Sequence, residues 1–305
     1  MIKWGIQNNR QRYKCQKCCR FFVWKIKSNS LRRQKVWFKK WILGRRTITE
    51  IASEKKCSTK TIFRLFKIFL DKPPVPQIKE NNDCHLIIDG TYHSDICLLN
   101  YLDNDLKHLQ YYEIGNETER NFRLGLELLK ASGLKIASIT SDGHKELIPA
   151  IKEVFPGMIH QRCVVHVQRM ALNYLTRFPK SEAGRELRKI VKDLHKINSR
   201  QEKSKWVAKF DKWNFNHREY INDRRRSFDS IHLYSHPDIR KARSAIKNSI
   251  PNLFYYLDNP KIPKSTNALE CRFSYFKNNL RIHRGLSKKN RKNFILWYNW
   301  LKYNG

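Results

Sequence analysis

The chain has 305 residues, of which 40% are hydrophobic and 12% aromatic, enough to bury a sizeable core. Its 62 Lys and Arg residues outnumber 27 Asp and Glu residues, giving a formal net charge of +35. This composition excludes a disordered chain, and the charge favours a polyanionic partner, above all nucleic acid.

The positive charge is concentrated at the two ends of the chain. Residues 1–80 carry 22 Lys and Arg residues against 4 acids, and residues 261–305 carry 11 against 1. The residues between them are nearly balanced, with 29 basic and 22 acidic side chains. A basic face that is only solvated would explain part of this excess, but the excess is larger than solubility requires, so we favour binding to nucleic acid.

The first 28 residues contain a Cys-x-x-Cys motif, Cys15 and Cys18, between two short basic and aromatic segments. This spacing is typical of one half of a zinc ribbon, in which two thiolates supply two of four tetrahedral ligands. Fourteen residues precede Cys15 and none is Cys or His. Three alternatives stay open: zinc is absent, zinc takes ligands from elsewhere, or the start shown lies within a longer reading frame. The eight cysteines form no regular disulfide framework, which predicts a reduced protein.

Residues 29–70 are expected to form three helices, beginning near Ser30, Thr47 and Ser58. The short turn between the second and third helices and the basic third helix are typical of a helix-turn-helix DNA-binding domain. A plain helical hairpin without a DNA function is the alternative. The residues expected to face the major groove are Ser58, Lys60, Thr61 and Arg64.

Residues 71–82 contain Pro73, Pro74 and Pro76, which favour an extended linker. Beyond it, His85 to Asp89 forms an apolar run that ends in Asp89-Gly90. This is typical of a strand that presents a carboxylate, although the same dipeptide more often marks a turn. The next elements are expected in the order strand 96–102, strand 108–114, helix 119–131, strand 136–140, helix 144–154 and strand 158–163.

This order predicts an α/β protein with a ribonuclease-H-like mixed sheet and helices packed on it. The fourth strand leads to Ser141-Asp142-Gly143 and so repeats the pattern of apolar strand, Asp and Gly. In the predicted sheet the first and fourth strands are neighbours, which would bring Asp89 and Asp142 to the same edge. Gly90 is expected to leave room for a metal ion and a DNA backbone.

Residues 168–260 are expected to form a large all-α insertion, with Trp206, Trp213 and Phe215 in its core. A final helix follows, on which Glu270 is the only acid among the last 45 residues. Lys277, Arg281 and Arg284 are expected on the polar side as DNA contacts. Asn267, three residues before Glu270, would allow a local capping box, but a metal ion explains the isolated acid better.

Asp89, Asp142 and Glu270 together suit a two-metal site, in which carboxylates hold two Mg²⁺ or Mn²⁺ ions roughly 4 Å apart for phosphodiester chemistry. The motifs that accompany them are Asp89-Gly90, Ser141-Asp142-Gly143, Cys163-x-x-His166, Thr266-Asn267-x-x-Glu270 and Arg281-x-His283-Arg284-Gly285-Leu286. In this order they resemble the DDE transposases of bacterial insertion sequences, Mutator-like superfamily, in the variety with an N-terminal zinc ribbon and helix-turn-helix.

The resemblance implies that Asp89, Asp142 and Glu270 are catalytic metal ligands in a ribonuclease-H-like domain spanning residues 83–305. Cys163, His166 and Asn267 would belong to a structural motif. The implied activity is Mg²⁺-dependent nicking at element ends, followed by strand transfer by the freed 3′-hydroxyl.

The implied partners are double-stranded DNA, with terminal inverted repeats and target DNA, and further copies of the chain in a homo-oligomer. A bacterial cytoplasmic location, with nucleoid association on DNA and no membrane partner, is expected. Two alternatives are a DNA-binding regulator or inactive, domesticated transposase, and a ribonuclease-H-like nuclease or resolvase.

Overall fold

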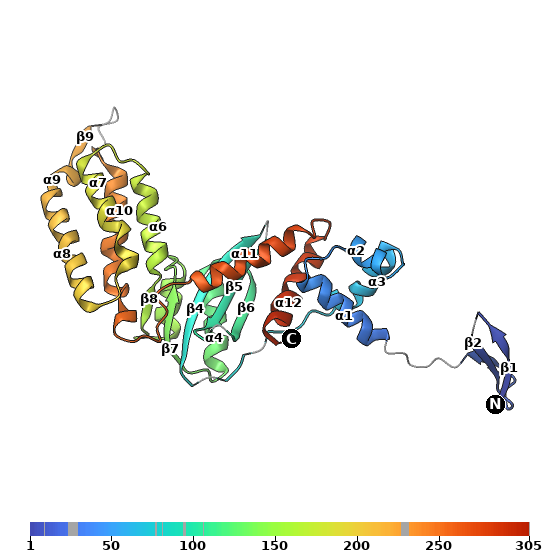
Figure 1. Ribbon diagram of the computed structural model, residues 1–305. Helices are drawn as coiled ribbons and strands as arrows, with labels where there is room; N and C mark the ends of the chain where they lie inside the picture. Colours follow the sequence, from blue (N-terminus) through green and yellow to red (C-terminus); the bar gives the residue numbers. More distant parts are fainter. Residues whose placement is uncertain are drawn as a thin grey trace. The chain divides into compact units, whose positions relative to one another are not determined.

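The computed structural model describes residues 1–8, 10–23, 30–76, 78–80, 82–93, 96–105, 107–226 and 232–304 (Figure 1). The chain divides into two compact units. One consists of Met1–Pro74 together with Ile282–Gly305, and the other of Val75–Arg281. The boundary after Pro74 lies within the linker that the prolines predict. Among the described residues, every helix is too short or too polar to cross a membrane.

The first unit begins with an antiparallel sheet of β1 (Ile2–Gln7), β2 (Arg10–Lys14) and β3 (Phe21–Val23). The chain reverses between β2 and β3 at the Cys-x-x-Cys motif. There the Cys15 amide donates to the Arg20 carbonyl at 3.0 Å, and the Cys19 amide donates to the Cys15 carbonyl at 2.9 Å. The motif therefore forms a tight turn between two short strands. Residues 24–28 of the predicted segment lie outside the described residues.

In the part of the first unit that the structure describes, the sheet is followed by helices α1 (Ser30–Leu43), α2 (Ile48–Glu54), α3 (Thr59–Leu70) and α12 (Lys288–Asn304). The three expected N-terminal helices are thus confirmed. Thr47 and Glu50 form a capping box on α2, and the Ser58 hydroxyl accepts from the Thr61 amide to cap α3. Buried aromatic and aliphatic side chains hold the helices together.

The C-terminal helix corrects the predicted domain boundary, which assigned all of residues 83–305 to one catalytic domain. Asn293 Nδ2 and Trp297 Nε1 of α12 donate to the last carbonyls of α3, each at 2.8 Å. The buried Trp41 ring packs edge-on against Phe294. Because α12 is amphipathic and α1 and α3 expose apolar faces, this helix completes the N-terminal core rather than extending the catalytic domain.

The second unit is built on a five-stranded sheet in the order β6-β5-β4-β7-β8. Its strands are β4 (Cys84–His93), β5 (Ile96–Asp103), β6 (Leu109–Gly115), β7 (Ile136–Ser141) and β8 (His160–Arg162). β4, β5 and β6 form the expected antiparallel meander, and β4–β7 and β7–β8 are parallel. The predicted adjacency of the first and fourth strands is confirmed, so the sheet is mixed.

The sequence predicts that the first strand ends at Asp89, but β4 is longer. It continues to His93 because β5 supplies hydrogen-bonding partners along its whole length, with Gly90 opposite Leu99. Gly90 has a second close neighbour besides β5. A Cβ atom at this position would collide with the Glu117 carboxylate, so the missing side chain accommodates Glu117, and Gly90 also lines the pocket beside Asp89.

Helices α4 (Glu119–Ala131) and α5 (Leu147–Val154) cover one face of this sheet. Their apolar residues join Leu86 and Ile88 of β4 in one buried cluster. Since side chains alternate along a strand, Asp89 points to the opposite face. Helix α11 (Asn267–Arg281) contacts β4 and contributes side chains to the pocket beside Asp89.

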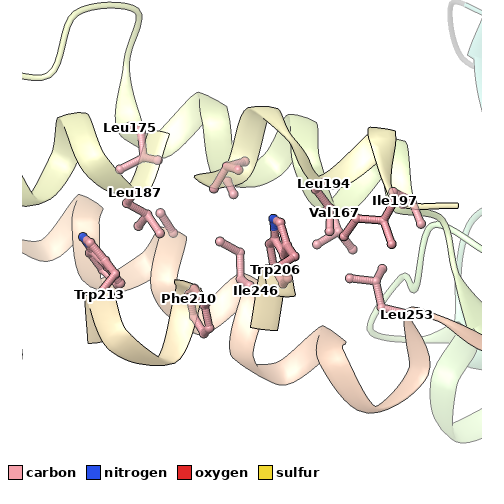
Figure 2. Close-up of a cluster of buried hydrophobic side chains, with 14 of the residues drawn as sticks. Val167, Leu175, Leu187, Leu194, Ile197, Trp206, Phe210, Trp213, Ile246 and Leu253 are labelled. Atoms are coloured by element: carbon pink, nitrogen blue, oxygen red, sulfur yellow. The ribbon is translucent and has the colours of Figure 1, made fainter. Parts of the chain in front are cut away.

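The insertion is a helical bundle with its own core (Figure 2). Its helices are α6 (Val164–Leu175), α7 (Glu182–Lys192), α8 (Arg200–Asn216), α9 (Arg218–Asn222) and α10 (Pro237–Ser249), with short 3₁₀ turns at Leu194–Lys196, Ile250–Asn252 and Tyr255–Leu257. Trp206, Phe210 and Trp213 recur at helical spacing and are buried, as expected for the two tryptophans. Phe215 is 78% exposed, so its predicted core position is wrong: it lies two residues beyond Trp213 and points away.

The insertion is also not entirely helical. β9 (Arg224–Arg226) and β10 (His232–Tyr234) pair as a small antiparallel ribbon within the segment that was expected to be all-α. Arg224, Arg225 and Arg226 are consecutive basic residues, so a helix continued through them would have no apolar face to bury. This explains why α9 ends at Asn222.

Candidate functional site

Two carboxylates are placed together by the register of two parallel strands. Ile88 of β4 is paired with Ser141 of β7, so Asp89 and Asp142 are the next residues on adjacent strands, which lie about 4.8 Å apart. The Asp142 Oδ1 atom accepts from the His144 amide at 2.9 Å, and the Ser141 hydroxyl accepts from the Gly143 amide at 3.0 Å. These bonds fix the turn that carries Asp142 away from β7.

Gly143 permits the close approach of Arg162 to this turn. Its φ of +76° belongs to the left-handed region, and a Cβ atom here would collide with the Arg162 side chain. Burial lowers the pKa of Arg162, and the negative charge of Asp142 opposes that shift. The glycine therefore lets a half-buried cation approach the turn that carries Asp142.

The third predicted acid, Glu270, comes from the first turn of α11 and is held by two residues of α6. Arg169 donates to it in a bidentate pair, with Nη1–Oε1 at 3.1 Å and Nη2–Oε2 at 3.3 Å. The His166 Nε2 atom lies 3.2 Å from Oε1. The Glu270 side chain is thus directed toward α6. Its carboxylate is paired with Arg169 and His166 rather than used in a local capping box with Asn267.

The Cys-x-x-His motif forms the junction between α6 and the start of α11. The Thr266 amide donates to Cys163 Sγ at 3.3 Å, and the Thr266 hydroxyl lies 3.3 Å from His166 Nδ1. A hydrogen bond with Cys163 raises the pKa of His166 to about 9, against the effect of burial, with help from Asp89 and Asp142. Burial acts to raise the pKa of Cys163, but bonds from His166 and the Thr266 amide outweigh it, and the net shift is downward.

The acids influence one another. Asp89 is 8% exposed, and burial raises its pKa to about 7, with further contributions from the charges of Asp142 and Glu270 and an opposing one from His166. Within the described ranges, no three His, Cys, Asp or Glu side chains are close enough together to hold a metal ion. The three predicted acids are close enough for the charges of Asp142 and Glu270 to shift the pKa of Asp89. The Glu270 carboxylate itself is paired with Arg169 and His166.

A pocket of about 520 Å³ opens beside these acids. The residues that line it include Asp89, His93, His166 and Glu270 and, along the exposed side of α11, Ser274, Lys277, Asn278 and Arg281. Two of the predicted DNA contacts, Lys277 and Arg281, are thereby placed at the acids. A phosphate chain that enters this pocket meets basic and amide side chains along one wall.

The remaining predicted DNA contacts belong to the first unit. Lys60 and Arg64 are exposed on α3, on the side away from the buried Ile62 and Phe66. Ser58 and Thr61 bond to each other at the start of that helix, their hydroxyl oxygens 2.9 Å apart.

The C-terminal Arg-x-His-Arg-Gly-Leu motif is split between the two units. Arg281 ends the second unit, and Arg284 is exposed in the first. His283 is buried against Trp41 and Phe294, where burial lowers its pKa to about 4. His283 is therefore a core residue of the first unit.

Sequence reasoning missed Arg162, Arg169 and Thr266. Arg169 carried a signal, because Cys163, His166 and Arg169 follow at intervals of three on one side of α6. Thr266 belongs to the Thr266-Asn267-x-x-Glu270 motif, but the motif alone assigns it no role. Arg162 had no signal, since its place beside Gly143 depends on how β7 and β8 pair.

Residues 107–284 match the family described as "Transposase, Mutator family". This match covers more than half of the chain and includes Asp142, Cys163, His166 and Glu270, while Asp89 lies before it. The chain therefore belongs to the Mutator family of transposases.

Two curated relatives agree with this. The chain is 33% identical over 97 residues to the transposase for insertion sequence element ISRM5 of Rhizobium meliloti (strain 1021), covering 32% of this chain and 24% of that protein. It is 29% identical over 127 residues to the transposase for insertion sequence element IS256 in transposon Tn4001 of Staphylococcus aureus, covering 40% of this chain and 29% of that protein. The matches thus span less than a third of either relative's length.

Proposed function

We propose that this protein is a DNA transposase that cuts DNA at the ends of an insertion sequence and joins the freed 3′-hydroxyl ends to target DNA. The observation that carries the proposal is the placement of Asp89 and Asp142 on adjacent parallel strands beside Glu270, with Asp89 buried among like charges. A ribonuclease-H-like fold for the second unit is part of the proposal and accords with its strand order.

The donor set fits Mg²⁺ or Mn²⁺, because carboxylate oxygens are the preferred ligands of these ions. A cation would also relieve the repulsion that helps to raise the pKa of Asp89. Bound there, two metal ions would activate a water or a 3′-hydroxyl and stabilise the leaving oxygen of a phosphodiester. Glu270 would join Asp89 and Asp142 as a ligand after exchanging its bonds with Arg169 and His166.

We assign the Cys163, His166 and Thr266 group a positioning role. It fastens the N-terminal end of α6 to the start of α11 and so sets where Glu270 can reach. The raised pKa of His166 keeps its ring cationic near the acids, where it can donate to a phosphate oxygen.

DNA would be bound in two places. In the first unit, α2 and α3 would act as a helix-turn-helix with Lys60, Thr61 and Arg64 facing the major groove. In the second, Lys277 and Arg281 would contact phosphates beside the acids, and Arg284 would add to the basic surface of the first unit. Cys15 and Cys18 would bind Zn²⁺ only with ligands from elsewhere, and a dimer or larger assembly would hold both element ends.

The test is cleavage of duplexes that carry the inverted repeats flanking the gene, in Mg²⁺ or Mn²⁺. Asp142→Asn should lower the cleavage rate by at least about 10³-fold, because it removes a ligand charge, while binding of the same duplex is retained. Asp211→Asn, which changes an exposed acid on α8, is the matched control and should cleave as the unchanged protein does.

Three other results would contradict parts of this proposal. Undiminished cleavage by Asp142→Asn would refute the assignment of the acids. Cleavage without joining of 3′ ends would favour a nuclease or resolvase. Specific binding with no metal-dependent cleavage by the unchanged protein would favour a DNA-binding regulator.

A further inference from the structure

Three hollows follow one another along helix α6 of the insertion. The first is the pocket beside the acids, and it shares His166 with a second hollow of about 310 Å³. The second shares Tyr174 with a third hollow of about 280 Å³. The second is lined by His166, Arg169, Met170, Asn173 and Tyr174. The hollows are therefore neighbours along α6, from the pocket beside Glu270 to the far end of that helix.

The path carries a net positive charge. Arg169 lies at its start, and Lys180 lines the third hollow. The Lys241 ammonium, on an exposed side chain of α10, lies 5.8 Å from the centre of the Tyr174 ring. Asp238 lines the third hollow as well and is paired with Lys241 at 3.4 Å, so that pair is neutral and the net positive charge of the two hollows comes from Arg169 and Lys180.

Aromatic rings accompany these cations. Tyr220 and His236 line the third hollow as a stacked pair, with ring centres 3.7 Å apart and planes at 15°. Phe178 precedes Pro179, another lining residue, and is 80% exposed with the Arg177 guanidinium 5.4 Å from its ring centre. An apolar ring so exposed adds little to folding stability, whereas exposed aromatic and Arg side chains together are typical of surfaces on which bases stack.

We propose that this path, which we name the α6 track, binds a single strand of DNA as it leaves the carboxylate site. The α6 track consists of Arg169, Asn173, Tyr174, Phe178 and Lys241 with the hollows between them. The identification of the ligand as DNA rests on the proposed function, and the track adds a substrate-binding surface on the helical insertion.

The dimensions suit one strand. His166 and Tyr174 are eight residues apart on α6, or about 12 Å along the helix axis, so the path is long enough to contact a few nucleotides of one strand. Hollows of this size are at the small end of the range for small-molecule sites, about 300–1,000 Å³. A duplex, whose major groove alone is about 12 Å wide, would lie across them without entering.

The first experiment measures binding by the full chain in EDTA, by fluorescence anisotropy with a labelled oligothymidylate of about 20 nucleotides and with a duplex of equal length. Phe178→Ala and Lys241→Ala each change an exposed side chain, so folding is not at risk. Their combination should weaken binding of the single strand roughly tenfold and binding of the duplex less than about twofold. Lys209→Ala, on exposed α8, is the matched control. Unchanged single-strand binding, or equal loss for both probes, overturns the proposal.

The second experiment locates the strand directly. An oligothymidylate containing 5-iodouracil, photo-crosslinked to the unchanged protein, should attach to Tyr174 or Phe178. Crosslinks confined to residues 1–74 overturn the α6 track even if Asp142→Asn abolishes cleavage as expected. Conversely, crosslinks on the track by a protein that never cleaves DNA leave the track in place and refute the proposed transposase chemistry.

Discussion

The sheet and the helix pair deliver their carboxylates in different ways. Asp89 and Asp142 follow paired residues on adjacent parallel strands, so backbone hydrogen bonds of the sheet fix their separation. Glu270 comes from α11, and its direction is set by side-chain bonds to Arg169 and His166 of α6. Two acids are thus held by the backbone and one by exchangeable ion pairs.

This difference indicates where a catalytic site of this kind can be rigid and where it can adjust. Asp89 lies within a paired strand and Asp142 directly follows one, so their backbones are held by the sheet, whereas Glu270 can change partners through rotation of its side chain. Substitutions at the rigid pair are therefore expected to have larger effects than a substitution beside the adjustable acid.

The largest effect is expected from Asp89→Asn. The pKa of Asp89 is raised to about 7 in the folded state, against about 3.9 in an unfolded chain, so ionised Asp89 destabilises the fold. Without metal, the neutral amide should raise the free energy of unfolding by about 3 to 4 kcal/mol at about pH 8. Between about pH 4 and 7 Asp89 is ionised in the unfolded chain and still protonated in the folded protein, so the gain from the amide grows as the pH rises. At about pH 5 it should be only about 1.5 kcal/mol.

Urea denaturation in EDTA at the two pH values measures this gain. Asp211→Asn on the surface of α8 is the control, and its effect should be small and independent of pH. A destabilised Asp89→Asn variant would show that the Asp89 carboxylate is well solvated or paired, contrary to its burial among like charges.

Gly143→Ala should disturb Asp142, the member of the rigid pair that follows β7. The new Cβ would displace Arg162, and the φ of +76° disfavours a side chain, so a loss of stability of about 2 to 3 kcal/mol is expected. Gly157→Ala is the matched control, because Gly157 has a φ of +79° with nothing near its Cβ position, and it should cost only about 1 kcal/mol.

The difference between these two glycine variants isolates the contact with Arg162. Thermal or urea denaturation gives the stabilities, and the cleavage assay should show a further loss for Gly143→Ala alone, because Asp142 would move. Equal stabilities for the two variants would mean that Arg162 rearranges at no cost and does not brace Asp142.

Arg169→Ala tests the adjustable acid and should have the smallest effect. Freed from its bidentate partner, Glu270 should become available as a ligand, and Mn²⁺ binding to the DNA-free protein should strengthen by roughly tenfold. Isothermal titration calorimetry measures the affinity, with Arg218→Ala on α9 as the control. An unchanged Mn²⁺ affinity would show that Arg169 does not compete with the metal for Glu270.

The sequence by itself determined the elements and the two sheet acids. Apolar runs that reach Asp89 and Asp142 mark strands, because alternation and β-branching are local properties, and the strand order predicts that the two are neighbours. The helices of residues 30–70 and 119–131 were likewise readable from caps and helical periodicity.

Only the tertiary structure decided which partners these elements meet. Pairing with β5 carries β4 past Asp89 to His93, packing places α12 with the N-terminal helices, and Glu117 fills the space at Gly90. The same holds for the bonds of Glu270 with Arg169 and for Arg162 beside Gly143. Each depends on side chains distant in sequence, whose meeting is set by packing of whole elements and leaves no local pattern.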